Sequence, residues 1–274
     1  MKERTFDVAV VGAGPAGSTA ARHCAMRDLS TLLLEKERMP REKPCAGGLT
    51  VAAARELGFS LPERLIERRC RGMKLRFRRT ENTITFDRDV IYMVRRSMFD
   101  EFLAGKAAEA GAELHEAEAC TGIEAGIDHV LVSTDKGRYR AKILIGSDGY
   151  FSAAAKVVRP PFSNVEVWVC VIAEIPLSSR EIEERMGNHV EIDYGAIDGG
   201  YAWLFFRRPA RVAQNRRFLF SVSQAFPRTR GVGPEGTMPI PRDRDRREEP
   251  QRVRLVARLP SPTPLGKESG WHDC

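Results

Sequence analysis

Apolar residues near the start of the chain follow the pattern of a strand, a helix and a second strand. Residues 6–11 read FDVAVV, a β-branched run that ends at a glycine and is typical of a strand buried on both faces of a parallel sheet. Residues 15–26 predict a helix, because a proline stands in its first turn and its alanines suit close packing. Residues 31–35 (TLLLE) predict the second strand. The connection between the strands is short enough for a right-handed βαβ unit.

Farther along the chain, short helices are mixed with alternating strands. Residues 97–110 predict an amphipathic helix with an apolar stripe on one side. Further helices are expected at 51–57 and 62–66, and strands at 73–77, 83–94, 112–115, 130–134 and 142–145. Residues 165–206 are mostly strand-like, with glycine-containing turns. This order of elements predicts an α/β fold.

The composition of the chain changes near residue 206. Residues 207–274 contain 9 of the 16 prolines, and 15 Lys and Arg against 7 Asp and Glu. The preceding residues hold 29 basic and 30 acidic side chains, so the formal net charge of +7 belongs to this tail. We therefore expect no nucleic-acid partner. Because hydrophobic periodicity also fades, the tail is expected to be disordered or the product of a shifted reading frame.

Cysteine spacing and hydropathy indicate a cytoplasmic protein. The six cysteines lie far apart, with no C-x-x-C pair and no His at zinc-finger spacing, so we interpret them as free thiols and expect no metal site. The first seven residues run directly into a strand-like segment, which does not resemble a signal peptide. The longest apolar runs, such as 165–175, are shorter than the ~20 residues of a transmembrane helix. Any membrane contact is therefore expected to be peripheral.

A glycine-rich turn joins the first strand to the first helix. Residues 12–17 read G-A-G-P-A-G, which matches the G-x-G-x-x-G pattern of dinucleotide-binding units. Gly12 would make the tight turn, Gly14 would let the backbone approach a pyrophosphate, and Gly17 would let helix and strand pack closely. Glu35 ends the second strand, where its carboxylate can accept hydrogen bonds from both ribose hydroxyls of an adenosine. Its negative charge disfavours NADP here, and the turn alone does not separate FAD from NAD.

Four further motifs carry a resemblance that extends from about residue 6 to residue 205. They are K-P-C-A-G-G-L at 43–49, R-S-M-F-D at 96–100, G-S-D-G at 146–149 and Y-A-W-L-F at 201–205. With these motifs the chain resembles the geranylgeranyl reductase family of FAD-dependent oxidoreductases, within the flavin hydroxylase-like superfamily. Two positions depart from the family pattern, since Ala46 stands in place of a glycine and Phe206 in place of a proline.

The resemblance implies an FAD site built from the turn, the end of the second strand, three of these motifs and a separate position at Cys120. The residues implied to contact FAD are Gly12, Gly14, Pro15, Ala16, Gly17, Glu35, Lys36, Cys45, Ala46, Gly47, Gly48, Arg96, Cys120, Asp148 and Gly149. Cys45 is also the candidate catalytic residue. Arg96 is implied to contact the ribityl-phosphate region, and the backbone at Cys120 the adenine. The alternatives are a buried, inert Cys45, an Arg96–Asp100 ion pair, and an ordinary β-turn at Asp148.

Two segments are candidates for contact with a lipid. Alternation along a strand places Tyr201, Trp203 and Phe205 on one face. Such a face is most simply a hydrophobic core, whereas the resemblance implies an aromatic wall against an isoprenoid or prenyl-lipid substrate. Residues 64–79 carry eight basic side chains, which indicate either a solvated strand face or a site for a lipid diphosphate or an anionic membrane surface.

The resemblance also implies a domain organisation: a Rossmann-like FAD-binding domain with an interleaved β-sheet substrate domain. The FAD-binding domain would comprise 1–68 and 95–160, and the substrate sheet 69–94 and 161–206, followed by the tail at 207–274. The family's returning G-D motif has no counterpart, so we expect the fold to be incomplete at its C-terminus.

The activity implied by the resemblance is reduction of carbon–carbon double bonds of an isoprenoid (geranylgeranyl-type) chain, with NADPH or another electron donor. An FAD-dependent aromatic monooxygenase and an inactive truncated fragment remain alternatives.

Overall fold

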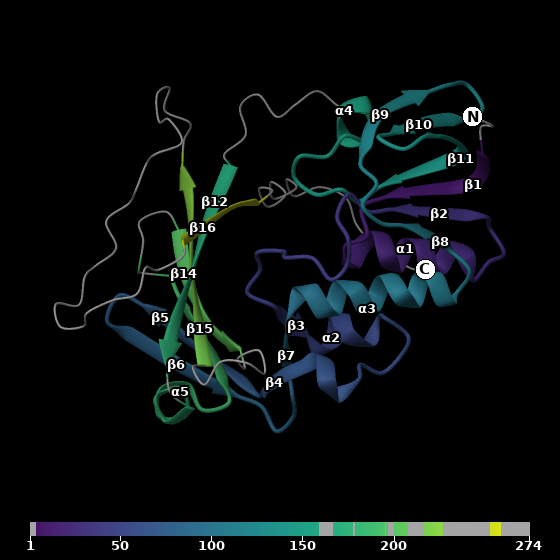
Figure 1. The fold of residues 1–274 in the computed structure, drawn as a ribbon. Coiled ribbons are helices and arrows are strands. Elements are labelled where there is room, and N and C mark those ends of the chain that lie inside the picture. The colour runs from purple at the N-terminus through teal and green to yellow at the C-terminus, as the bar shows by residue number, and fades with distance from the viewer. Residues whose placement is uncertain are drawn as a thin grey trace, which may run out of the picture.

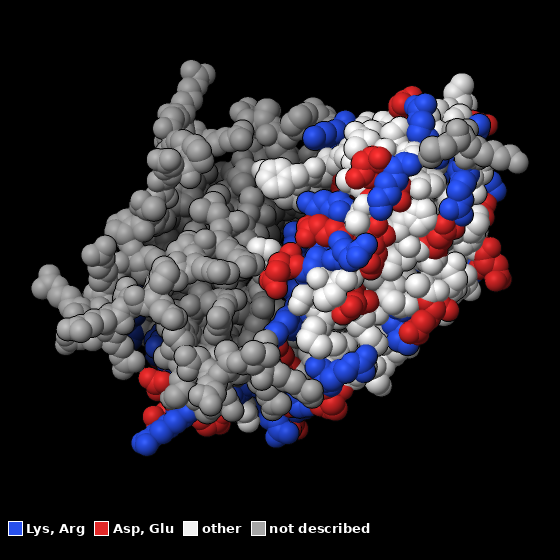
Figure 2. All heavy atoms as spheres, viewed as in Figure 1, with Lys and Arg blue, Asp and Glu red and all other residues white. Residues whose placement is uncertain are grey.

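A computed structural model of the chain contains two large sheets and a smaller sheet between them (Figure 1). The structure describes residues 4–158, 167–177, 179–194, 196, 200–207, 216–226 and 253–258. Within these ranges, no helix combines the length and the apolar character needed to cross a membrane. Acidic and basic side chains are interspersed over the described surface visible in Figure 2.

The first sheet has six strands in the order β8-β2-β1-β11-β10-β9. Their bounds are β1 Arg4–Val11, β2 Thr31–Leu34, β8 Glu113–His115, β9 Cys120–Ala125, β10 Val130–Thr134 and β11 Arg138–Gly146. The strand β1 pairs in parallel with β2 and β11, and β2 pairs in parallel with β8. The helix α1 (Pro15–Ala25) connects β1 to β2, so the expected βαβ unit is confirmed. A short helix, α4 (Ala155–Val158), follows β11.

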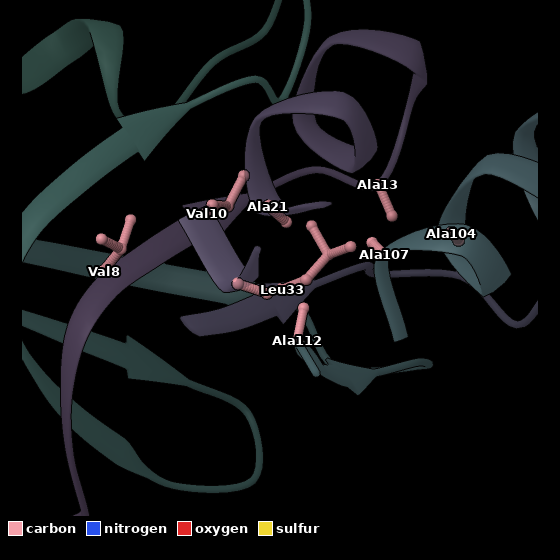
Figure 3. Close-up of a cluster of buried hydrophobic side chains, with 9 residues drawn as sticks. Val8, Val10, Ala13, Ala21, Leu33, Ala104, Ala107 and Ala112 are labelled. Atoms are coloured by element: carbon pink, nitrogen blue, oxygen red, sulfur yellow. The ribbon is translucent and has the colours of Figure 1, made fainter. Parts of the chain in front are cut away.

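Small side chains allow two helices to pack closely on one face of this sheet. The helix α1 lies beside α3 (Arg96–Glu109), the amphipathic helix expected from the sequence. Val8, Val10 and Leu33 of the strands form a buried cluster with alanines of both helices, among them Ala21 and Ala107 (Figure 3). Deleting one of these branched side chains would cost about 1–5 kcal/mol, depending on how far the cavity collapses.

The second sheet has seven strands in the order β16-β12-β15-β14-β13-β5-β6. Their bounds are β5 Gly72–Phe77, β6 Thr80–Thr85, β12 Val167–Leu177, β13 His189–Asp193, β14 Gly200–Arg207, β15 Arg216–Phe226 and β16 Val253–Arg258. The hairpin β5–β6 comes from before α3, and the other strands come from after the first sheet. The interleaved two-sheet α/β fold is therefore confirmed.

A three-stranded sheet, in the order β3-β7-β4, connects the two regions. It consists of β3 (Gly48–Thr50), β4 (Ile66–Cys70) and β7 (Ile91–Val94). The short helices α2 (Val51–Arg55) and η1 (Glu63–Leu65) follow β3, near where the sequence predicted them. The segment Cys45–Gly48, called the 45–48 loop below, leads into this sheet. Because β3 begins at Gly48, the sheet fixes the end of the loop.

Three expectations about elements need correction. The single strand expected at 83–94 is two strands, β6 and β7, in different sheets. The strand-like region at 165–206 contains a helix, α5 (Ser179–Met186), in which Ile182 and Met186 are buried one turn apart. The sheet also continues beyond residue 206, since β15 and β16 pair with β12. The rest of 207–274 lies outside the described residues.

Candidate functional site

The turn after β1 requires glycine for steric reasons. Gly12 has a φ of +98°, and a Cβ at this position would lie 2.4 Å from the Ser147 carbonyl oxygen. A Cβ on Gly17 would lie 1.8 Å from the Gly12 oxygen. Pro15 and Ala16 form the first turn of α1, whose N-terminus therefore lies at this turn. The close approach also joins the turn to the 146–149 segment after β11, where the Ser147 N–H donates to the Val11 oxygen at 2.8 Å.

Glu35 follows β2 and points at the same turn, as expected. Its side chain is buried, and its Oε2 accepts a hydrogen bond from the Ala13 N–H at 3.1 Å. Its Oε1 accepts one from the Glu37 N–H at 3.2 Å. The carboxylate is thus fixed beside the N-terminus of α1, where a ribose next to a bound pyrophosphate would lie.

Arg41 is a buried residue of this site that the sequence did not single out. Its Nε lies 3.1 Å from Glu35 Oε2, and its Nη1 lies 3.1 Å from Asp100 Oδ2. A Cβ on Gly14 would lie 3.8 Å from Arg41 Nη2, so the guanidinium is next to the backbone that a pyrophosphate would approach. The sequence did not indicate that Arg41 would contact Glu35, because Lys36 and Arg38 are also basic and lie in the same interval before the 43–49 motif.

Arg96 forms the ion pair that was the alternative to cofactor binding. Its Nε and Nη2 donate to the two oxygens of the fully buried Asp100 at 2.7 and 2.8 Å. Burial opposes the charge of Arg96, but pairing with Asp100 outweighs this and raises the Arg96 pKa above its ordinary value. The guanidinium also contacts the Cys45 thiol. Arg96 therefore lies at the 45–48 loop while paired with Asp100.

The turn at 146–149 is held by its aspartate. Asp148 Oδ2 accepts hydrogen bonds from the Ala153 N–H at 2.5 Å and the Ala154 N–H at 3.4 Å. The other oxygen, Oδ1, is buried and has no hydrogen-bond partner among the described residues. Gly149 has a φ of +83°, as a tight turn needs. An ordinary turn explains Oδ2 but leaves Oδ1 unsatisfied, and a buried acceptor of this kind fits a hydroxyl-bearing ligand.

The 45–48 loop packs directly against the aromatic residues of β14. Trp203 and Ala46 are buried in one cluster, with Tyr201 and Phe205 packed against it. A Cβ on Gly48 would lie 3.1 Å from Phe205 Cε2, so the ring rests on the glycine backbone. The three aromatic side chains share one face, as the alternation predicted, with ring centroids 5.1 and 6.4 Å apart. The structure places these residues against the 45–48 loop, and their lining of a substrate cavity stays a prediction.

Other candidate residues lie at the edges of this arrangement. Gly47, with a φ of +79°, lies within the loop, and its N–H donates to Cys45 Sγ at 3.4 Å. Lys36 is exposed just after Glu35. Cys120 begins β9 and is half-buried, and burial raises the pKa of its thiol. Contact of Lys36 or Cys120 with a cofactor stays a prediction.

The described residues fit the adenosine, pyrophosphate and ribityl parts of FAD. The glycine turn leaves its backbone accessible at the N-terminus of α1, and Glu35 supplies a fixed carboxylate beside it. One buried polar atom nearby, Asp148 Oδ1, has no hydrogen-bond partner among the described residues, whereas Arg41 Nη1 is in an ion pair with Asp100. A hydroxyl group of a dinucleotide would satisfy Asp148 Oδ1, and its pyrophosphate would lie near the Arg41 guanidinium.

The fold and this site define a protein of the dinucleotide-binding class, and known structures share this fold. A geranylgeranyl bacteriochlorophyll reductase-like protein from Thermoplasma acidophilum superposes with a TM-score of 0.69 at 22% identity, covering 82% of this chain and 57% of that one. The halogenase PltM, solved in complex with FAD, superposes with a TM-score of 0.64 at 14% identity, covering 83% and 53%.

Residues 5–189 match the FAD binding domain family, and the chain belongs to this family. It is 31% identical over 207 residues to digeranylgeranylglycerophospholipid reductase 1 of Methanothermobacter thermautotrophicus, covering 72% of this chain and 52% of the relative. It is 30% identical to the corresponding reductase of Methanocaldococcus jannaschii, covering 73% and 52%. The resemblance to geranylgeranyl-type reductases is thus confirmed, and the chain spans about half the length of these relatives.

Proposed function

We propose that this chain carries the FAD site, and part of the substrate site, of an oxidoreductase that reduces carbon–carbon double bonds of an isoprenoid chain. The carrying observation is the direct packing of the Cys45–Gly48 loop against Trp203 and Phe205. This packing brings an apolar, aromatic surface to the loop beside the candidate flavin site. The similarity to digeranylgeranylglycerophospholipid reductases supports an isoprenoid as the substrate.

Each part of the site has a proposed task. The glycine turn, Glu35 and Arg41 bind the adenosine diphosphate half of FAD, and Asp148 accepts a hydrogen bond from a hydroxyl of the ribityl chain. The aromatic residues orient the isoprenoid and exclude water. When bound in its reduced form, FAD supplies a hydride to one carbon of the double bond, and the other carbon takes a proton. NADPH or another donor would return the two electrons.

Cys45 is the proposed source of this proton. Within residues 45–48, the Cys45 thiol is the side-chain group that carries a transferable proton. The Arg96 guanidinium that contacts it would stabilise the thiolate left after proton transfer. Solvent would then return the proton to Sγ. Loss of a general acid typically slows a reaction by about 100-fold or more.

The test uses the full chain loaded with FAD and reduced with dithionite without oxygen. Mixed with a digeranylgeranyl glycerophospholipid, it should yield product that has gained one H₂ per reduced double bond, as measured by mass spectrometry. Cys45→Ala should slow this step about 100-fold while retaining FAD. Cys24→Ala, which removes another half-buried thiol, should not slow it.

Two results would contradict this function. One is an FAD-loaded chain that leaves the isoprenoid unreduced. The other is flavin that is reoxidised only when oxygen and an aromatic substrate are both present, which would identify a monooxygenase.

A further inference from the structure

Four neighbouring strands of the second sheet, β14-β13-β5-β6, have one face toward α5 and one apolar face. On the face toward α5, the Lys74 Nζ donates to the Arg185 oxygen of α5, and Arg185 Nε lies 3.9 Å from the buried Glu191. Strand register places the residues of the other face side by side across four strands. The apolar residues of this face, called the aromatic face below, are Met73, Leu75, Phe77, Ile84, Val190, Ile192, Tyr194, Tyr201, Trp203 and Phe205. The polar residues Thr80 and Asn82 of β6 share it.

The aromatic face runs from the candidate site to the surface. Its inner end contains Phe205 and Met73, which pack in one cluster near the 45–48 loop. Its outer end contains Phe77 and Tyr194, whose exposed fractions are 54% and 50%. Ile84 of the edge strand β6 is 41% exposed and lies opposite Met73, toward the inner end. A contiguous group of exposed apolar side chains on one face marks a contact surface.

Two arginines flank the outer end of this face. Arg78 and Arg79 form the turn between β5 and β6, and both are exposed. Neither makes an ion pair with a carboxylate that the structure describes, and Arg78 lies over the Phe77 ring at 5.2 Å. Other basic residues of the 64–79 run are paired, for example Arg69 and Arg71 with Asp89 and Arg76 with Glu81. A solvated strand face therefore accounts for these paired residues. It does not account for Arg78 and Arg79, which have no carboxylate partner among the described residues.

We propose that the β5–β6 turn and the outer end of the aromatic face dock on an anionic lipid bilayer. Exposed aromatic side chains enter the headgroup region, and unpaired arginines beside them are attracted to anionic headgroups. The apolar face then leads from the bilayer to the 45–48 loop, which suits a substrate that is itself a lipid. The choice of a lipid partner rests in part on the proposed function.

Vesicle co-sedimentation of the full chain tests this docking without using flavin or activity. Binding to phosphatidylcholine vesicles should increase when phosphatidylglycerol is included and decrease at high salt. Arg78→Ser/Arg79→Ser should weaken binding to the anionic vesicles about 25-fold, because each arginine contributes about fivefold. Phe77→Ser should weaken it about tenfold.

Matched controls remove the same groups elsewhere. Arg27→Ser/Arg138→Ser deletes two exposed arginines of the other region, and Ile127→Ser deletes a fully exposed apolar side chain. Residues 207–274 carry 14 arginines, which would attract anionic vesicles equally in every variant. The hairpin variants, Arg78→Ser/Arg79→Ser and Phe77→Ser, are therefore compared with these controls. The proposal expects the controls to bind like the unsubstituted chain.

Equal vesicle binding by hairpin and control variants would overturn the proposal. So would a dimer, detected by sedimentation velocity, that Phe77→Ser dissociates without affecting vesicle binding, since a second copy would then cover the face. FAD binding is measured in parallel. If the chain does not bind FAD but its vesicle binding still depends on Phe77, Arg78 and Arg79, the proposed function fails and the docking surface is supported.

Discussion

At the scale of single residues, the candidate site depends on how the Glu35 carboxylate is occupied. A carboxylate has about four acceptor positions. The N–H groups of Ala13 and Glu37 and the guanidinium of Arg41 already contact these oxygens. Two ribose hydroxyls therefore need one of the three to give way, and only the Arg41 side chain can turn without moving the backbone. Sequence spacing predicted Glu35, but a contact between two side chains in a folded loop leaves no such periodic signal.

A second buried carboxylate belongs to Glu118, whose backbone pairs with that of Glu35. The Glu118 N–H donates to the backbone carbonyl oxygen of Glu35 at 2.9 Å. Its side chain accepts hydrogen bonds from Thr134 and Tyr139, each at 2.7 Å. Burial alone would raise the Glu118 pKa, but these bonds and His115 lower it below its ordinary value. Burial and the neighbouring Glu118 raise the pKa of Tyr139 to about 12, so the phenol stays a donor.

Because the pKa of Glu118 is lowered by folding, the free energy of unfolding should depend on pH in a specific way. Its pKa is lower in the folded chain than in the unfolded chain, where it is about 4.3. The carboxylate therefore stabilises the fold fully above that value, and this contribution is lost as pH falls through the folded-state pKa. Glu118→Gln should cost about 1–3 kcal/mol in the free energy of unfolding at pH 7. In urea titrations from pH 7 to pH 3, it should lose less stability than the unsubstituted chain.

Glu124→Gln is the matched control, because Glu124 is an exposed partner of Arg138. It should keep the pH dependence of the unsubstituted chain. An identical dependence in Glu118→Gln would mean that Glu118 does not titrate as its contacts indicate.

At the scale of elements, the sequence predicted best where a single periodicity runs through the whole element. The unit β1-α1-β2 has such patterns, and its bounds match the structure within one or two residues. The eight-residue helix α5 was missed because its two buried positions stand among strand-like neighbours. The strand β15 was missed because the arginines and prolines around it masked the alternation of Phe218, Phe220 and Val222.

The contact between the 45–48 loop and β14 can be tested by packing. A Cβ on Gly48 would lie 3.1 Å from Phe205 Cε2, tighter than ordinary contact. Gly48→Ala should therefore lower the free energy of unfolding by about 1–3 kcal/mol in urea titrations. Adding Phe205→Leu to that variant should restore part of the loss, because the smaller side chain makes room for the methyl group.

Gly105→Ala provides a control with the opposite expected sign. Gly105 lies inside α3 with open space at its Cβ position, so alanine should stabilise the helix by about 0.5–1 kcal/mol. No coupling between the substitutions at Gly48 and Phe205 would contradict direct packing of the loop on β14.

At the scale of the whole molecule, the site is assembled from segments far apart in the chain. The glycine turn, Glu35, the 45–48 loop, Arg96 and the 146–149 turn converge on one region of the first sheet and its connection to the second. The sequence motifs identified most of these segments, because glycines are needed locally where the backbone turns tightly or packs closely. Their convergence follows from the parallel order β2-β1-β11 and from the small sheet that joins the two regions, which local patterns do not encode.

Calorimetric titration of the 274-residue chain with ADP tests the proposed dinucleotide site most directly. ADP contains the adenosine and pyrophosphate that the glycine turn and Glu35 are proposed to hold, and it needs neither substrate nor redox chemistry. ADP should bind with one molecule per chain, and Glu35→Gln should weaken binding about tenfold or more, because hydrogen bonds from the ribose to a carboxylate are stronger than those to an amide. Absence of ADP binding, or equal affinity in Glu35→Gln, would contradict the assignment of this site.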